Sequence, residues 1–244
     1  FESLMAICHE TGHALYQQGL PVEYRDQPVG DALGAATHES QSLLMELQVC
    51  GSREFIEFLA PMIRAAFGRD SGDAAWSAEN LYRHSTHVER SLIRVYADEI
   101  TYPLHVILRY ELEAQLISGE LAVKDLPEAW NAAMRKYLGR STDGDFANGC
   151  MQDVHWFAGL YGYFPTYTLG ALAAAQWYAT AKQADADIPA GIARGDMQPR
   201  LSWLRRNIHG QGRRLTLQPL LGDVTGESLD ASYFRNHLQA RYLP

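Results

Sequence analysis

Apolar residues recur along most of this chain three or four positions apart, which is the spacing of one face of an α-helix. The period is clearest where Phe55, Ile56, Leu59, Ile63 and Phe67 follow one another. Alternation of apolar and polar residues, the pattern of a half-buried strand, nowhere extends beyond a few positions. The sequence therefore predicts an all-α protein.

Helix boundaries follow from capping residues, glycine and proline. Ser3 is the expected N-cap of the first helix, which Gly19 and Pro21 end. The stretch 74–118 is expected to break near residues 84–86, and Pro103 is expected to kink or interrupt it. The complete set of further predicted helices covers residues 37–50, 53–67, 74–118, 128–138, 165–184, 189–194, 200–209 and 230–243.

The region between the helices at 128–138 and 165–184 is irregular and rich in glycine and aromatic residues. Such a stretch favours the packing of a core or the lining of a cleft over a linker between domains. The sequence shows neither an internal repeat nor a low-complexity tract. We therefore treat residues 1–244 as a single helical portion.

The first predicted helix contains the stretch HETGH at residues 9–13. Positions four apart lie on one face of a helix, so the imidazoles of His9 and His13 can reach one ion. Glu10 lies one residue round the helix, where it can address a water without binding the ion. This is the HExxH pattern of zinc peptidases, which also requires a third ligand.

Three residues compete for the place of the third ligand. Glu39 follows His13 after a loop broken by proline and glycine, and it lies near the start of the second predicted helix. Two histidines and one glutamate leave a fourth zinc position open, as a catalytic site requires. His38 and Glu46 are the rival third ligands.

Composition excludes several classes of function. The formal net charge of −8 argues against a nucleic-acid partner. Uninterrupted apolar runs are too short to span a membrane. The three cysteines are an odd number and widely spaced, which favours a reducing compartment such as the cytoplasm over a disulfide scaffold.

Several stretches together resemble one family, the thermostable (Taq-type) metallocarboxypeptidases. The matching stretches are HETGH at 9–13, HESQ at 38–41, IRVYAD at 93–98 and GYFPTYTLG at 162–170, followed by WLRRNIH at 203–209 and VTGE at 224–227. The resemblance implies a helical zinc metallopeptidase that acts in the cytoplasm. The N-terminal half of that family, with its HPF and DxRxT motifs, has no counterpart in these residues.

Motif and resemblance together imply that His9, His13 and Glu39 bind Zn2+, with Co2+ as a possible substitute. Glu10 is the expected general base, taking a proton from the zinc-activated water and passing it to the leaving amine. Tyr167 is the first candidate for the donor that stabilises the oxyanion, as the resemblance suggests.

His155 is the second oxyanion candidate, and Tyr163 is interpreted as a packing residue. Removal of C-terminal residues requires a cation for the terminal carboxylate, and Arg94 is the candidate because its guanidinium binds carboxylates bidentately. The alternative for Arg94 is an ion pair within a helix with Asp98, four residues on. Asp98 is also a candidate support for the zinc histidines.

The leading hypothesis is a zinc-dependent carboxypeptidase that removes C-terminal residues from peptides and forms a homodimer, as the resemblance implies. One alternative is an endopeptidase or dipeptidase of the same helical zinc class. The other is a zinc-binding but catalytically incomplete fragment that needs the missing half or a partner.

Overall fold

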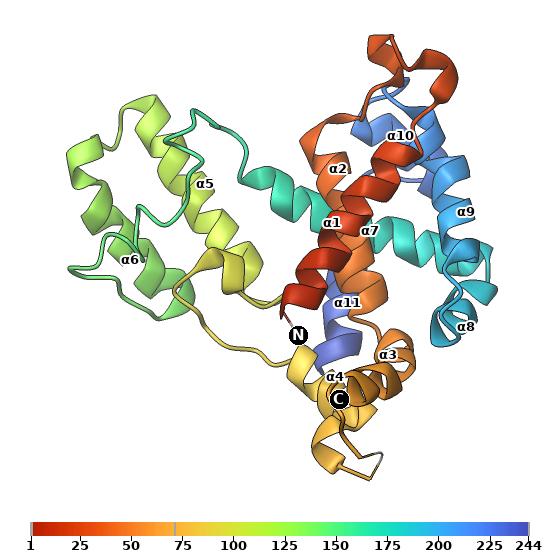
Figure 1. Ribbon diagram of the computed structural model, residues 1–244. Helices are drawn as coiled ribbons and strands as arrows, with labels where there is room; N and C mark the ends of the chain where they lie inside the picture. The colour runs from red at the N-terminus through yellow and green to blue at the C-terminus, as the bar shows by residue number, and fades with distance from the viewer. Residues whose placement is uncertain (1, 71, 244) are drawn as a thin grey trace. The chain divides into compact units, whose positions relative to one another are not determined.

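The described part of the chain, residues 2–70 and 72–243 of the computed structural model, consists of helices and irregular segments without a β-strand (Figure 1). The all-α prediction is confirmed. The chain forms two compact units. The first unit contains the residues up to Thr86 together with those from Leu169 onward, and the second is His87–Thr168. These units subdivide the stretch that the sequence analysis treats as a single portion.

Helices build the first unit from both ends of the chain. Its α-helices are α1 (Glu2–Gln18), α2 (Gly34–Leu43), α3 (Arg53–Ala66), α4 (Ala78–Ser85), the part of α7 (Pro165–Ala184) from Leu169, α8 (Asp187–Ala193), α9 (Gln198–Asn207), α10 (Leu217–Thr225) and α11 (Ala231–Tyr242). A π-helical segment, η3 (Leu44–Cys50), continues α2 directly. Short 3-10 turns lie at Val22–Tyr24, Pro28–Gly30, Ala74–Trp76 and His209–Gln211.

The core of the first unit forms around α7. Small buried residues of this helix, including Ala173 and Ala174, let neighbouring helices approach its backbone closely. Leu44, Trp177 and Leu221, each with no exposed surface, pack in the same cluster. Burial of side chains of this size stabilises a fold by about 1.5–3 kcal/mol each.

The second unit is built on two packed helices, α5 (Tyr102–Ser118) and α6 (Leu126–Leu138). Its core consists of Leu108, Leu112, Trp130, Met134 and Leu138. Short 3-10 turns precede the helices at Arg94–Tyr96 and Val123–Asp125. Residues 139–164 are irregular, as the sequence predicts.

Most helix predictions are confirmed, but several details are wrong. Ser3 lies inside α1 and is not its N-cap, because the helix already includes Glu2. Of the two outcomes expected at Pro103, an interruption is observed and a kink is not: Pro103 lies in the first turn of α5, where its missing N–H costs nothing. Helix α10 is not predicted from the sequence, because its short run contains Pro219 and Gly222, residues that usually mark a loop.

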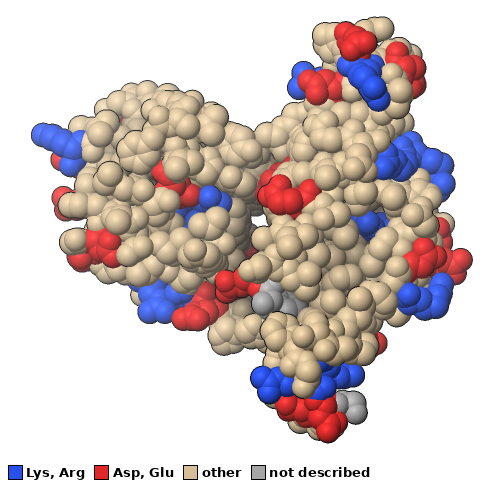
Figure 2. All heavy atoms as spheres, viewed as in Figure 1, with Lys and Arg blue, Asp and Glu red and all other residues tan. Residues whose placement is uncertain are grey.

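Charged side chains form small mixed groups on the face of the molecule that Figure 2 shows, separated by wide neutral areas. Among the described residues, none of the helices combines the length and the apolar character that crossing a membrane requires.

Candidate metal centre and active-site residues

Two helices of the first unit bring three metal-binding side chains together. His9 and His13 project from α1, and Glu39 projects from α2, which lies beside it (Figure 1). The three offer ligand atoms that all lie within 4.8 Å of one another. Nε2 of His9 is 3.9 Å from Oε1 of Glu39, and Nε2 of His13 is 3.6 Å from its Oε2.

These atoms fit a zinc ion. Zinc bonds of about 2.0–2.1 Å place tetrahedral ligand atoms about 3.3 Å apart, so the two distances of 3.9 and 3.6 Å to Glu39 need only a small contraction. Two imidazole nitrogens and one carboxylate form the donor set of catalytic zinc sites with an open position. The structure therefore brings together the three residues that the sequence predicts as ligands.

Two glycines allow this close approach of helices. A Cβ atom on Gly12 would lie 2.4 Å from the carbonyl oxygen of Gln41 and 2.6 Å from the Cα of Ser42. A Cβ atom on Gly170 of α7 would lie 3.0 Å from both the Cβ and the Cγ of Glu39. Glycine is therefore required at Gly12, where rigid backbone lies opposite, whereas at Gly170 a side chain would need Glu39 to shift by a few tenths of an ångström.

The two rival ligands occupy different places. Oε2 of Glu46, in the π-helical segment η3, lies 2.8 Å from Nδ1 of His9. Nδ1 of His38 lies 2.6 Å from Nδ1 of His13. Both rivals thus contact the ring nitrogen opposite the one that faces Glu39, and neither belongs to the group of three.

The surroundings shift the pKa values of the two ligand histidines in opposite directions. Burial lowers the pKa of His9, but the hydrogen bond and charge of Glu46 outweigh it, so the pKa lies above its ordinary value. Burial, together with the neighbouring His9 and His38, lowers the pKa of His13 to about 4. His13 is therefore neutral near pH 7, with a lone pair available for a metal.

Glu10 is exposed at the surface of the first unit, one residue along α1 from His9. Its negative charge acts on both ligand histidines and opposes the effect of burial on the pKa of His13. This position, close to the ligands in sequence and open to water, is what a base that accepts a proton from water needs.

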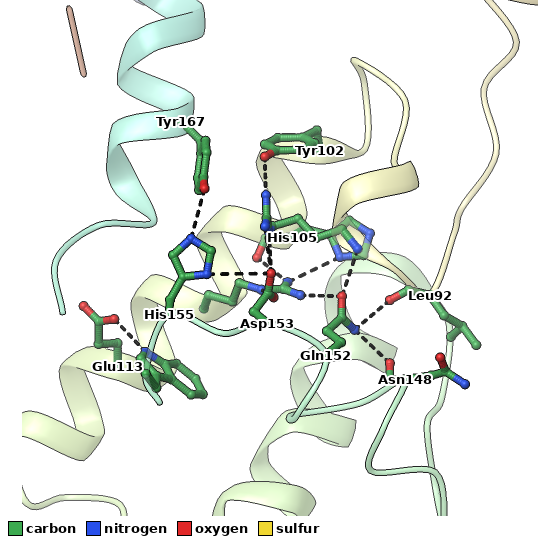
Figure 3. Close-up of polar contacts among 12 residues, drawn as sticks. Leu92, Tyr102, His105, Glu113, Asn148, Gln152, Asp153, His155 and Tyr167 are labelled. Carbon is green, nitrogen blue, oxygen red and sulfur yellow. Dashed lines mark hydrogen bonds and ion pairs between the residues drawn. The ribbon is translucent and has the colours of Figure 1, made fainter. Parts of the chain in front are cut away.

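A buried polar cluster occupies the second unit (Figure 3). Asp153 binds two guanidinium groups: Arg94 at 2.7 Å and Arg109 at 2.6 Å. Arg94 also donates to the hydroxyl of Tyr102, and Arg109 donates to Gln152 at 2.7 Å. Burial raises the pKa of Asp153, but the charge of Arg109 and the hydrogen bond from Arg94 outweigh it and lower the pKa overall.

The proposed helical ion pair between Arg94 and Asp98 is wrong. The two residues do not share an α-helix, because Arg94 lies in a 3-10 turn that ends before Asp98. The carboxylate of Asp98 instead accepts from the backbone N–H groups of Ile100 and Thr101, and from the Thr101 hydroxyl. Asp98 thus stabilises the turn that leads into α5.

The two oxyanion candidates are paired with each other. Nε2 of His155 lies 2.9 Å from the hydroxyl of Tyr167, as the dashed line in Figure 3 shows. Burial lowers the pKa of His155, and the charge of Arg94 adds to this, so the ring is neutral near pH 7. Tyr163 packs its ring 5.4 Å from that of His155 and 5.5 Å from that of Tyr167.

Sequence reasoning missed the centre of this cluster. Asp153 joins Arg109 to Arg94, and Glu113 accepts from Trp156 and from the backbone of Gly162. The available signal was the run QDVHW at residues 152–156, which sets polar side chains inside an apolar stretch. Arg109 gave no signal, because a single arginine on an amphipathic helix is usually exposed.

Helices that bring two HExxH histidines to a downstream glutamate define the metal centre of a helical metallopeptidase. The family model of the carboxypeptidase Taq (M32) metallopeptidases matches residues 1–242. The chain belongs to this family.

Relatives and solved structures agree with this assignment. The chain is 47% identical to thermostable carboxypeptidase 1 of Thermus thermophilus, over 96% of this chain and 45% of the relative. It is 35% identical to thermostable carboxypeptidase 1 of Pyrococcus furiosus, over 99% of this chain and 48% of the relative. Metallocarboxypeptidase 1 of Trypanosoma cruzi superposes with a TM-score of 0.94 at 41% identity, covering 99% of this chain and 50% of that one. The chain thus spans about half the length of these relatives.

Proposed function

We propose that this chain carries the metal site and part of the substrate site of a zinc-dependent carboxypeptidase, which removes C-terminal residues from peptides. The convergence of His9, His13 and Glu39 in a chain of the M32 family is the observation that carries this proposal. These three residues would hold the ion. Bound zinc supplies Lewis acidity, which polarises a carbonyl and lowers the pKa of water.

The chain's own residues perform the proton transfers and hold the substrate. Glu10 takes a proton from the attacking water and gives it to the departing amine nitrogen. Tyr167 donates its hydroxyl proton in a hydrogen bond to the oxyanion, and His155, whose Nε2 lies 2.9 Å from that hydroxyl, is the alternative donor. Water attacks the peptide carbon, the C–N bond breaks, and the products are a shortened peptide and a free amino acid.

Arg94 is the proposed cation for the terminal carboxylate of the peptide. The guanidinium of Arg94 binds Asp153 through two N–H groups and donates a third to the hydroxyl of Tyr102. A guanidinium has five N–H donors, so Arg94 keeps donors for a second carboxylate. Replacement by lysine keeps the charge but loses the bidentate fork, so we expect R94K to raise KM for peptides with a free C-terminus.

A zinc-binding but catalytically incomplete chain is the second candidate, and the fact that the relatives are about twice as long favours it. We also propose, from the resemblance alone, a homodimer in the cytoplasm. Light scattering of the purified chain tests the dimer.

The decisive experiment has two stages. Elemental analysis measures zinc in the wild type, in H13A and in H87A, a control that removes an exposed histidine outside the metal centre. We expect one zinc per chain in the wild type and in H87A, and none in H13A.

Mass spectrometry then follows peptides with free and amidated C-termini. Trimming of the free peptide alone supports the carboxypeptidase. Cleavage of both peptides indicates an endopeptidase, and bound zinc without cleavage indicates the incomplete chain. A wild type that folds but binds no zinc contradicts the proposed metal site.

A further inference from the structure

Each candidate ligand histidine has its second ring nitrogen engaged by a side chain of the second helical segment. Nδ1 of His9 meets the carboxylate of Glu46 at 2.8 Å, and Nδ1 of His13 meets Nδ1 of His38 at 2.6 Å. The contacts run in opposite order along the two segments, so α1 is antiparallel to α2 and η3. Each ring therefore faces Glu39 with Nε2 and contacts a second side chain, Glu46 or His38, with Nδ1.

The direction of these hydrogen bonds follows from the chemistry of imidazole. A neutral ring donates from one nitrogen and accepts at the other. When the Nε2 lone pair of His13 faces an ion, its Nδ1 carries the proton and donates to His38. Nε2 of His38 must then carry a proton and donate in turn. The side-chain amide of Gln17 lies 2.9 Å from that nitrogen, and a half-turn of the amide presents its oxygen as the acceptor.

The backbone around Glu46 is adapted to its position. Glu46 lies in the π-helical segment η3, and the N–H of Gly51 bonds to its carbonyl oxygen, five residues earlier, at 2.8 Å. Segments of this kind are rare and occur frequently at functional sites. Glu39 and Glu46 are seven residues apart and both face α1, where Glu39 meets both histidines and Glu46 meets His9 alone.

We propose that Glu46, and His38 together with Gln17, are positioning residues that fix the rings of His9 and His13 with Nε2 toward the ion. This inference rests on the proposed metal site. The two supports are unequal, because a carboxylate accepts a charge-assisted hydrogen bond about twice as strong as the neutral one that His38 accepts. Glu46 therefore contributes more to metal binding than His38 does, although neither binds the ion.

Metal affinity and coordination separate this role from that of a ligand. The full chain, freed of metal, is titrated with Zn2+ against a competing chelator and with Co2+ by absorption spectroscopy. The variants are E46A, the isosteric E46Q, H38L, and H38N, which restores an acceptor. E57Q removes an exposed glutamate of α3 as the matched control, and E39Q removes the proposed third ligand.

For E46A we expect a zinc Kd raised by about 10–100-fold, the range for loss of a group that orients a ligand. E46Q and H38L should each raise the zinc Kd by less than E46A does. H38N should have a zinc Kd between that of H38L and that of the wild type. All four should still bind one ion per chain with the Co2+ band shape of the wild type. E57Q should match the wild type, whereas E39Q should lose the ion or change the Co2+ spectrum.

Three results would overturn the inference. A zinc Kd for both E46A and H38L equal to that of E57Q would show that neither residue orients a ring. A Co2+ spectrum of E46Q changed like that of E39Q would make Glu46 a ligand. If the folded wild type bound neither Zn2+ nor Co2+, the proposed metal site itself would be refuted. The titration of the wild type distinguishes this outcome from the first two without any variant.

Discussion

Gly12 lies where α1 meets the backbone of α2, so its replacement by alanine tests how the metal centre is spaced. The new Cβ atom would lie 2.4 Å from the carbonyl oxygen of Gln41. A carbon atom normally approaches such an oxygen to about 3.3 Å. The two helices must therefore separate by about 1 Å at this point, because both atoms belong to rigid backbone.

The expected cost combines two opposing effects. Overpacking costs about 1–3 kcal/mol, and the better helix propensity of alanine offsets up to about 1 kcal/mol of this. We expect G12A to lose about 1–2 kcal/mol of unfolding free energy. The same displacement carries His9 and His13 away from Glu39 by more than a metal site tolerates. The zinc Kd should therefore rise by more than about tenfold, as it does when the support of a ligand is lost.

Urea denaturation of the metal-free protein and chelator competition measure these two quantities. The matched control is G222A in α10, where a Cβ atom meets nothing within 4 Å. G222A should gain up to about 1 kcal/mol from helix propensity and leave zinc binding unchanged. If G12A were as stable as G222A and bound zinc like the wild type, contact of α1 with α2 at Gly12 would not set the spacing of the ligands.

Two further predictions concern buried cations and pH. Arg200 is 3% exposed, its Nε has no hydrogen-bond partner, and no carboxylate pairs with it among the described residues. R200M removes this buried charge, so it should raise the unfolding free energy measured by urea denaturation by about 1–3 kcal/mol. An unchanged or lower urea midpoint would show that interactions of the guanidinium offset the cost of burying its charge. Burial lowers the pKa of His209 to about 3, so between pH 6.5 and pH 3 the unfolded chain takes up a proton that the native state excludes. Stability should therefore fall as the pH drops, by about 2 kcal/mol at pH 5 relative to pH 8 from this residue, and H209Q should show a shallower pH dependence of the urea midpoint.

The sequence predicted much of the metal centre because its parts are local. His9 and His13 are one helical turn apart, so their shared face follows from the helix alone. The glutamate at position 39 came from a motif in the next helix, and the structure brings it to both imidazoles. The same local logic failed for Arg94 and Asp98, where the expected helix does not form and the arginine pairs with Asp153, 59 residues away.

The sequence by itself determined the helical class, most helix positions, the two histidines on one face and the identity of the family. These depend on spacing within a few residues and on motifs that are read directly. Only the tertiary structure decided that Glu46 and His38 contact the far nitrogens of the ligand rings, and that Asp153 joins two buried arginines. Those contacts join residues 25 to 59 positions apart, and their energy depends on which helices meet and at what distance. Spacing along the chain carries no record of that distance, which glycines such as Gly12 set through the absence of a side chain.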